Sequence, residues 1–557
     1  MRTISSVFMT ALFVLGLSCK QEPAPPSDMQ AEAAPVREWK PEDMRNMTGL
    51  TAQRGVIQNS DHDTEGYVLF EPFLTTSTFL VNKDGEVVHR WDTDLTSMDS
   101  YLQPDGHLFR LERDEDFPTF AAGGQSGRIT EYDWDGNVVW KFKMANEKEL
   151  LHHDFEILPN GNILAIAYEV VPAQEAVALG RNPEHLPKAG LWLDKVVEIR
   201  PTRPEGGEIV WTWYMKDHLV QNFDKSKKNF GEPAENPRKI DINFHSTEVG
   251  GGPPPSMEQI QQMIQQGMTT SNATPENQGS DITHTNAISY NAGLDQIVLS
   301  MPGMNEVAIL DHSTTTVEAK GSTGGRWGHG GDLLYRWGNP QNYGKGTEAN
   351  RKLYGQHDVK WVPKGLPGEG HLTVFNNDIY DGKAKMPTIW AGFPTASPPE
   401  FAMAIGDVGN YSAVWEFIPP TDANGAYLLK EDGTFGPDEP VWSYSAPDTY
   451  SFYSAFISGA HRLPNGNTFI TQGMQGRFFE VTPEKEIVWE FWTPFAGDHR
   501  LPDGSFPQPA GPMRYATFRS TLLPADFPAF AGKDLKPMAE QPEPFKMPPP
   551  PQAQAQQ

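Results

Sequence analysis

The chain has 557 residues, with 45 lysines and arginines against 72 aspartates and glutamates, so its formal charge is −27. A charge of this sign disfavours broad binding to nucleic acid or to anionic membranes, because contact with phosphate needs clustered basic side chains. Hydrophobic residues make up 38% of the chain and can build a large core, whereas the single cysteine excludes an intrachain disulfide and cysteine-ligated zinc or iron–sulfur sites.

Residues 1–18 are predicted to be an export signal of the lipoprotein type. An apolar stretch from Ile4 to Leu17 is too short to cross a bilayer and fits the core of a signal peptide. A small residue stands directly before Cys19, as in a bacterial lipobox, so we expect Cys19 to be lipidated. The alternative is an ordinary secretory signal with an incidental cysteine. In either case we expect export, to the periplasm or the cell envelope.

The segments that flank the folded part are predicted to be flexible. Residues 19–60 begin with a stretch rich in Pro, Ala and acidic side chains, which is typical of a linker. Residues 531–557 end in PPPPQAQAQQ and are expected to form a disordered Pro/Gln-rich tail. The folded domain is therefore predicted to span residues 61–530.

A turn followed by an apolar run that contains tryptophan recurs six times along this domain. The instances are Asp84–Trp91, Asp135–Trp140, Gly206–Trp211, Gly331–Trp337, Asp438–Trp442 and Glu484–Trp489. Asp-Gly before β-branched residues is a hairpin signal. The shortest intervals between these tryptophans match the length of one four-stranded propeller blade.

Turns of the Pro-Asn-Gly type alternate with the tryptophan runs, as at Pro159–Asn162 and Pro464–Asn467. Each of these turns precedes a second strand-like run, so that one unit reads as several strands joined by tight turns. The alternative is a set of unrelated hairpins in a β-sandwich. Six ordered repeats favour an all-β fold, a six-bladed β-propeller.

The longest interval between tryptophans predicts an insertion at about residues 214–280. Within it, Ser256 to Gln259 has the pattern of a capping box, which marks the start of a helix. The apolar residues that follow, Met257, Ile260, Met263 and Ile264, share one face of that helix. We expect a helical cap beside one rim of the propeller; a solvated excursion is the alternative.

Three of the 15 histidines occupy the same position in their repeats. His153 and His357 each lie six residues before a turn that begins with proline, and His284 lies seven residues before the Asn291 turn. Each is therefore predicted to begin the first strand of its blade. Because first strands line the axis of a propeller, the three imidazoles are expected to converge at one mouth of the channel.

Two kinds of chemistry suit three converging imidazoles. They can bind a metal, as three-histidine zinc sites do, or they can grip an anion while one of them acts as a nucleophile or acid–base. Asn286 alternates onto the same strand face as His284. A neutral amide donor favours a site for an oxyanion over a metal site.

These motifs resemble the bacterial aryl-sulfate sulfotransferases that work without a nucleotide sulfate donor. The segments that carry the resemblance are DITHTNAISYNAGLDQIVLS (Asp281–Ser300), EVAILDHSTTT (Glu306–Thr316), GGDLLYRWGNP (Gly330–Pro340), QHDVKWVP (Gln356–Pro363), LTVFNND (Leu372–Asp378) and SGAHRLPNGNTFITQGMQGRFFEVT (Ser458–Thr482). The similarity runs from about residue 60 to about residue 525. It implies a periplasmic six-bladed propeller, in agreement with the fold predicted from the repeats.

The resemblance also implies a reaction and assigns roles. Members move a sulfuryl group from a phenolic sulfate ester to another phenol by a ping-pong route, without a cofactor or metal. His357, in the Gln-His motif, would attack sulfur and hold a transient sulfohistidine. His284 and Asn286 would bind the sulfuryl oxygens or handle the phenol proton, and His153 would complete the cradle.

One position departs from the family pattern. The strand after the His-x-Asn motif ends at Met301, where an arginine that binds the sulfuryl group is expected. Arg326 or Arg336 could take its place as a substrate-binding cation.

Two other functions remain open. The three histidines could form the metal site of a hydrolase or lyase, or the propeller could bind ligands without catalysis. The expected partners are a small aryl sulfate and a phenolic acceptor, with no nucleic acid and with membrane contact only through the lipid anchor.

Overall fold

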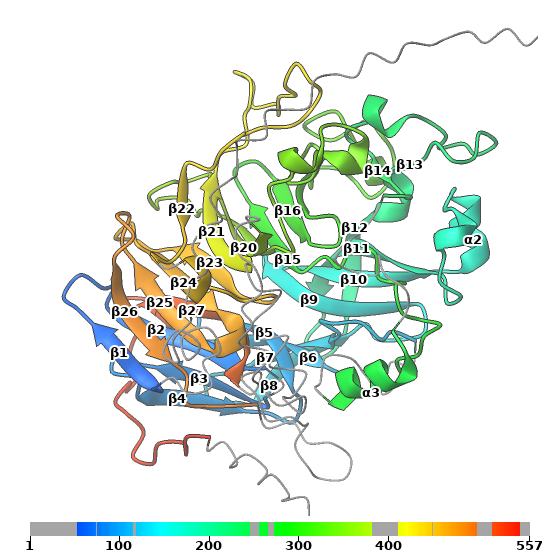
Figure 1. Cartoon of the computed structure of the whole chain (residues 1–557). Coiled ribbons are helices and arrows are strands. Elements are labelled where there is room, and N and C mark those ends of the chain that lie inside the picture. Colours follow the sequence, from blue (N-terminus) through cyan, green and yellow to red (C-terminus); the bar gives the residue numbers. More distant parts are fainter. Residues whose placement is uncertain are drawn as a thin grey trace, which may run out of the picture. The chain divides into compact units, whose positions relative to one another are not determined.

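Six antiparallel sheets, one for each predicted repeat, form the blades of a β-propeller (Figure 1). Named from the innermost strand outward, blade 1 holds β27 (Thr517–Pro524), β2 (Gly66–Pro72), β3 (Ser77–Val81) and β4 (Val87–Asp92), and blade 2 holds β5 (Ser97–Leu102), β6 (Leu108–Arg113), β7 (Gly127–Tyr132) and β8 (Val138–Lys143). Blade 3 holds β9 (Glu149–Ile157), β10 (Ile163–Val171), β11 (Leu191–Pro201) and β12 (Gly207–Tyr214), and blade 4 holds β15 (Ala287–Asn291), β16 (Gln296–Met301), β17 (Glu306–Asp311) and β18 (Tyr335–Trp337). Blade 5 holds β19 (His357–Trp361), β20 (Leu372–Tyr380), β21 (Asn410–Phe417) and β22 (Trp442–Tyr444), and blade 6 holds β23 (Gly459–Arg462), β24 (Thr468–Gln472), β25 (Arg477–Val481), β26 (Ile487–Trp492) and β1 (Gly55–Asn59). The predicted all-β, six-bladed fold is confirmed.

The computed structural model describes residues 53–73, 75–114, 119–244, 255–265, 272–380, 410–447, 449–497 and 515–545. The predicted signal peptide, Cys19 and most of the predicted linker lie outside these residues. All described residues belong to one compact unit, Trp39–Gln557. None of the helices described in this unit is both long and apolar enough to span a membrane.

The two ends of the described chain complete two of the blades. β27 comes from the C-terminal part of the chain, yet it is the innermost strand of blade 1 and pairs antiparallel with β2, with Tyr67 opposite Leu523. β1, from the N-terminal part, adds an outermost strand to blade 6 by pairing with β26. Pairing of late with early strands closes the ring and leaves no open inner edge.

The repeated tryptophans join each blade to the next. In all six repeats the indole nitrogen donates a hydrogen bond to the segment that joins the third strand to the fourth strand of the following blade, counted from the axis. The pairs are Trp91 to the Asp133 carbonyl, Trp140 to the Gly206 carbonyl, Trp211 to Thr314 Oγ1, Trp337 to the Pro437 carbonyl, Trp442 to the Pro483 carbonyl and Trp489 to the Lys83 carbonyl. The last of these bonds links blade 6 back to blade 1. Each tryptophan of the sequence repeat therefore makes a hydrogen bond that joins its blade to the next one.

The segment between β12 and β15 contains β13 (Leu219–Val220), β14 (Ile240–Asp241) and the helix α3 (Met257–Gln265). α3 begins with the predicted capping box, since the Ser256 amide donates to Gln259 Oε1 and the Gln259 amide donates to Ser256 Oγ. Ile260 is fully buried against Phe120 and Trp192, whereas Met257, expected on the same face, is 46% exposed.

Two further parts of the chain lie outside the sheets. A short helix, α2 (Ala173–Ala178), connects β10 to β11. Beyond β27, residues 531–545 are described and bond to the propeller: the Met538 amide donates to the Val87 carbonyl, and the Phe545 amide donates to the Pro494 carbonyl.

The tryptophan bonds between blades lead to a prediction on stability. Trp140 is fully buried, and Trp140→Phe removes its bond to the Gly206 carbonyl, which still accepts from the Thr202 amide, so the free energy of unfolding should fall by about 0.5–1.5 kcal/mol. Trp442 makes an equivalent bond but is only partly buried, so Trp442→Phe should cost less, because water can replace the lost donor. Urea denaturation of the two variants measures the difference; equal losses would contradict this role of the bond.

Candidate active site

His357 begins the innermost strand of blade 5, whereas His284 precedes β15 of blade 4 and His153 lies within β9 of blade 3, so the prediction that each histidine begins its strand holds only for His357. The backbone at these positions is unusual. His153, His284 and Asp358 have φ values of 58°, 52° and 54°, and Ile457 before β23 has a φ of 53°. Left-handed backbone is rare for residues other than glycine, and for a β-branched residue it is strained. The pairing of β9 with β10 and of β19 with β20 is also interrupted close to these residues. Such irregularities turn side chains away from the regular pleat.

His153 and His284 form a direct pair at this point. Their Nε2 atoms lie 3.1 Å apart, and His284 Nδ1 lies 2.5 Å from Asp281 Oδ2. His153 is 2% exposed, whereas the side chain of His284 is 19% exposed and is therefore the member of the pair that solvent reaches. The pair is covered by Gly124, where an added Cβ would lie 2.1 Å from the His153 ring. Only glycine allows the backbone to approach the imidazole so closely.

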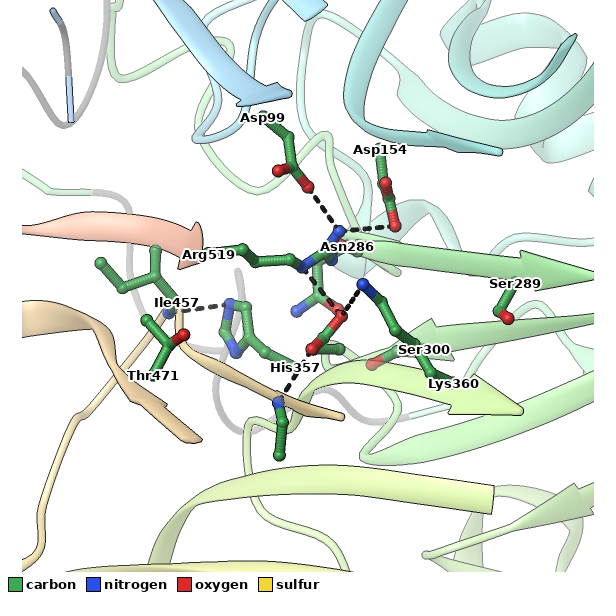
Figure 2. A network of polar contacts seen from close by, with 12 residues as sticks. Asp99, Asp154, Asn286, Ser289, Ser300, His357, Lys360, Ile457, Thr471 and Arg519 are labelled. Atoms are coloured by element: carbon green, nitrogen blue, oxygen red, sulfur yellow. Dashed lines mark hydrogen bonds and ion pairs between the residues drawn. The ribbon is translucent and has the colours of Figure 1, made fainter. Parts of the chain in front are cut away.

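His357 is held on both sides of its ring. Nδ1 lies 2.9 Å from Asn377 Oδ1 and 3.0 Å from the Gly355 carbonyl oxygen. Nε2 accepts a hydrogen bond of 3.1 Å from the Ile457 amide, which Figure 2 shows. Because both neighbours of Nδ1 are acceptors, the proton of the neutral ring must sit on Nδ1. Burial lowers the pKa of His357 to about 3, despite the opposing bond with Asn377. His357 is thus a neutral imidazole with its lone pair on Nε2.

The histidine pair and His357 belong to one site. The Phe518 ring, on β27, lies 6.2 Å from the His153 ring and 6.5 Å from the His357 ring. Burial lowers the pKa of His153 well below its ordinary value, and the positive charges that His284, His152, His357 and Arg519 can carry lower it further. The structure therefore brings together the three histidines predicted from the sequence.

Asn286, predicted to bind substrate, is fully buried one layer behind these rings. Its amide nitrogen donates to the Gln356 carbonyl over 2.9 Å, next to His357. Asn286 therefore links the strand of His284 to the strand of His357, while its side-chain oxygen has no hydrogen-bond partner among the described residues.

A buried arginine that sequence reasoning missed lies at the centre of the same region (Figure 2). Arg519, on β27, is 5% exposed, and its Nη2 donates to the Asn286 carbonyl over 2.6 Å. Nη1 lies 2.7 Å from Asp99 and 2.7 Å from Asp154, and Nε lies 3.0 Å from Asp358. We call these four side chains the Arg519 cluster. The cluster joins the inner strands of blades 1, 2, 3 and 5, and the carbonyl bond adds blade 4.

The structure does not bring Arg326 or Arg336 to the histidines. Arg336 is fully buried on β18, an outermost strand, where its Nε lies 3.1 Å from Glu306 Oε1. Arg326 is exposed and donates to the Gly293 carbonyl in the turn after β15, at the end of that strand opposite His284. Met301 is fully buried in an apolar cluster. Neither arginine therefore replaces the cation expected at position 301.

Two further residues of this region, His152 and Asp194, escaped prediction. His152, directly before His153 in the sequence, has its Nδ1 2.7 Å from His153 Nδ1 and its Nε2 3.1 Å from Asp194 Oδ1. The adjacent pair His152-His153 is a visible signal in the sequence, whereas nothing near Asp194 or Arg519 distinguishes either from other strand residues. Over the described parts of the chain, no group of three or more histidine, cysteine or acidic side chains is arranged to hold a metal ion.

A six-bladed propeller whose inner strands present histidines at one site defines the class of protein. The chain belongs to the arylsulfotransferase family (ASST), whose model matches residues 54–491.

No curated protein matches the chain. Among solved structures, it is similar to a protein of unknown function from Bacteroides caccae (10% identity, 77% of this chain and 94% of that chain, TM-score 0.36). It is also similar to virginiamycin B lyase from Staphylococcus aureus (10%, 79% and 85%, TM-score 0.32) and to a periplasmic gluconolactonase from Pseudomonas aeruginosa (10%, 77% and 96%, TM-score 0.31). Likeness at this level indicates nothing about activity.

The position of Arg336 leads to a second prediction. Arg336→Met should lower the free energy of unfolding by about 3–5 kcal/mol, because it leaves Glu306 buried without its partner. The double variant Arg336→Met/Glu306→Leu should lose less, since no charge is then stranded. Chemical denaturation measures both, with Arg326→Ala as an exposed control expected to stay within about 0.5 kcal/mol of the parent. Equal instability of the single and double variants would contradict the pairing.

Proposed function

We propose that this arylsulfotransferase moves a sulfuryl group from an aryl sulfate ester to a phenolic acceptor through a sulfohistidine formed on His357. The observation that carries the proposal is the state of His357. Its ring is neutral, Asn377 and the Gly355 carbonyl hold the proton on Nδ1, and the lone pair is on Nε2, where it attacks once the bond from the Ile457 amide is released. A nucleophile that needs no prior deprotonation suits a transfer dominated by positioning and charge stabilisation.

The first half of the reaction forms a bond between His357 Nε2 and sulfur, while the bond from sulfur to the phenolic oxygen breaks and a phenolate leaves. The Ile457 amide, which donates to Nε2 before substrate binds, then has no acceptor on the ring and becomes free to donate to a sulfuryl oxygen. Preorganised backbone donors of this kind stabilise charge that develops during transfer.

In the second half, the oxygen of an acceptor phenol attacks sulfur, the bond from sulfur to Nε2 breaks, and the phenol gives up its proton. His284 is the side chain suited to manage that proton. It is partly exposed, and although burial opposes the effect, Asp281 raises the pKa of His284 above its ordinary value. A histidine beside a carboxylate can exchange a proton with a bound phenol.

We further propose that the protein is exported and anchored by a lipid on Cys19. The support is the apolar signal-like stretch that ends directly before this cysteine. Fractionation of cells that produce the parent chain or Cys19→Ala tests this: the variant should be released from the membrane fraction. Equal membrane association of the two would contradict the anchor.

The central experiment is incubation of the protein with para-nitrophenyl sulfate, with and without phenol. We expect nitrophenol release that phenol stimulates, and its loss in His357→Ala. His185→Ala, an exposed histidine on another part of the surface, should keep the parent activity. Radiolabelled sulfur from the donor should remain on the parent protein when acceptor is omitted, and should be absent from His357→Ala.

Two outcomes would support the other functions. Turnover that depends on a stoichiometric metal and survives in His357→Ala would indicate a metal-dependent hydrolase or lyase. Absence of turnover with any aryl sulfate would indicate a binding protein.

Asn377 provides a separate prediction. Asn377→Leu removes the acceptor that orients His357, so kcat should fall roughly 10–100-fold, the range seen when an orienting partner of a histidine is removed. KM should change little, because Asn377 is fully buried and does not face the donor.

In the parent, kcat/KM should show no loss between pH 6 and pH 4 from His357, since its pKa is about 3 and the ring stays neutral above that value. A drop in kcat/KM from titration of His357 near pH 6.5 would contradict the assigned state.

A further inference from the structure

Three histidines run in an unbroken line between two carboxylates beside His357. His152 Nε2 lies 3.1 Å from Asp194 Oδ1, and the Nδ1 atoms of His152 and His153 lie 2.7 Å apart. The Nε2 atoms of His153 and His284 lie 3.1 Å apart, and His284 Nδ1 lies 2.5 Å from Asp281. We call His152, His153 and His284 the histidine chain. Every ring nitrogen in the chain takes part in one of these four contacts.

The four contacts need more protons than three neutral rings possess. Two nitrogens at hydrogen-bond distance need one proton between them. A buried ring nitrogen next to a carboxylate oxygen needs a proton as well, because the carboxylate charge would repel its bare lone pair. The four contacts therefore need four N–H groups. A neutral imidazole has one N–H, so three neutral rings supply three. The number of N–H groups equals the number of contacts only when one ring of the chain is doubly protonated.

No other group in reach supplies the missing proton. His152 is fully buried and His153 is 2% exposed. His152 Nε2 and Asp194 Oδ1 make no hydrogen bond of regular geometry with any described residue, so each of these two buried atoms has only the ion-pair contact with the other, 3.1 Å away, to compensate it. Asp194 Oδ2 already accepts from the hydroxyls of Thr283 and Thr285, as expected of an ionised carboxylate. Although burial opposes it, the bond with His152 lowers the pKa of Asp194. Both carboxylates therefore act as acceptors.

From this geometry we infer that the histidine chain stores one extra proton and that its positive charge binds the sulfuryl group of the donor. This inference deepens the proposed function and rests on it for the identity of the anion. His284 is the end of the chain that solvent reaches, so charge placed there faces the substrate. The chain would thus provide the cation that the family pattern places at position 301, where this protein has methionine.

Arg519, the neighbouring cation, is less suited to bind the sulfuryl group. Arg519 approaches the site, but Asp99, Asp154 and Asp358 surround its guanidinium. His152 and Asp194 act in this proposal as positioning residues, because His152 contacts His153 and Asp194 contacts His152, away from the end of the chain that solvent reaches.

The groups that face the chain set its dependence on pH. Asp194 and Asp281 stabilise the extra proton, whereas His357 and Arg519 face it from neighbouring blades and oppose it when charged. Tyr168 donates to Asp281 and stacks on His152, and stays protonated because burial raises its pKa well above its ordinary value. The pKa of His284 is raised, so the charge is present at low pH and is lost as pH rises through that value.

Asp194→Asn is the sharpest test. Thr283 and Thr285 donate to Oδ2, so the side-chain oxygen of the asparagine should stay at that position and its NH₂ group should face His152 Nε2. The amide then supplies the fourth N–H, and three neutral rings satisfy the remaining contacts. The variant should keep its fold but lose the stored charge.

The measurement is magnetic resonance of isotope-labelled histidine ring nitrogens, together with the affinity for inorganic sulfate across pH. His357 is a neutral internal reference. His312, whose two ring nitrogens contact Glu198 and Asp295, is a charged one. We expect one doubly protonated ring shared among His152, His153 and His284 in the parent and none in Asp194→Asn. Sulfate affinity near neutral pH should fall at least about tenfold in the variant. Asp295→Asn, which changes the surroundings of His312 away from the site, should leave sulfate affinity unchanged.

Three neutral rings in the parent protein would overturn the inference, and this result needs no variant. Loss of the charge in Asp194→Asn with unchanged sulfate affinity would overturn its role in binding. Neither readout depends on turnover. If the charge and the sulfate affinity behave as expected while His357→Ala retains full transfer activity, the proposed function fails and the stored proton stands.

Discussion

The Arg519 guanidinium sits in the middle of the propeller against three carboxylates, and the arrangement of the inner strands depends on it. Asp99, Asp154 and Asp358 come from three different blades, and each is buried. Removing one partner of a buried ion pair strands a charge, which costs about 3–5 kcal/mol. Arg519 reaches these carboxylates only when β27, from the C-terminal part of the chain, is seated among strands that precede it in the sequence. Closure of the ring and assembly of the site are therefore one event.

That constraint also explains how strained backbone is maintained at the site. His153, His284, Asp358 and Ile457 all have left-handed backbone, which a free segment would not adopt. Asp358 is held by Arg519, and the segment of His284 is held through the Asn286 carbonyl, which the same arginine binds. The strain turns the imidazoles out of the regular pleat and toward one another. Rigid neighbours on several blades hold them there, which suits catalysis by positioning.

The overall charge of the protein opposes the binding of an anionic substrate, so the attracting positive charge must come from the site itself. The chain carries a formal charge of −27, and an aryl sulfate is itself an anion. The arginine nearest the histidines is matched by carboxylates, and Arg326 and Arg336 lie elsewhere. Under the proposed function, a proton shared along the histidine chain supplies the positive charge. Such a charge differs from that of an arginine because it disappears as pH rises, so substrate binding would become sensitive to pH.

Local patterns in the sequence were enough to predict much of this architecture. The tryptophan repeat predicted six blades because each indole makes the same bond to the next blade. The spacing of His153, His284 and His357 before their turns predicted their convergence, because equal positions in a propeller repeat lie at equal depth along the axis.

Other features depended on contacts between distant residues, which leave no local signal. Arg519 lies more than 150 residues from Asp358 in sequence, and Asp194, on β11, meets His152, on β9, across the intervening strand β10 of blade 3. Arg336 fitted the sequence expectation for a substrate-binding cation, but its position on an outermost strand buries it against Glu306. Periodicity thus determined the blades and the depth of each histidine. Only the closed tertiary structure decided which charges meet, because charge balance in a buried site depends on every blade that contributes to it.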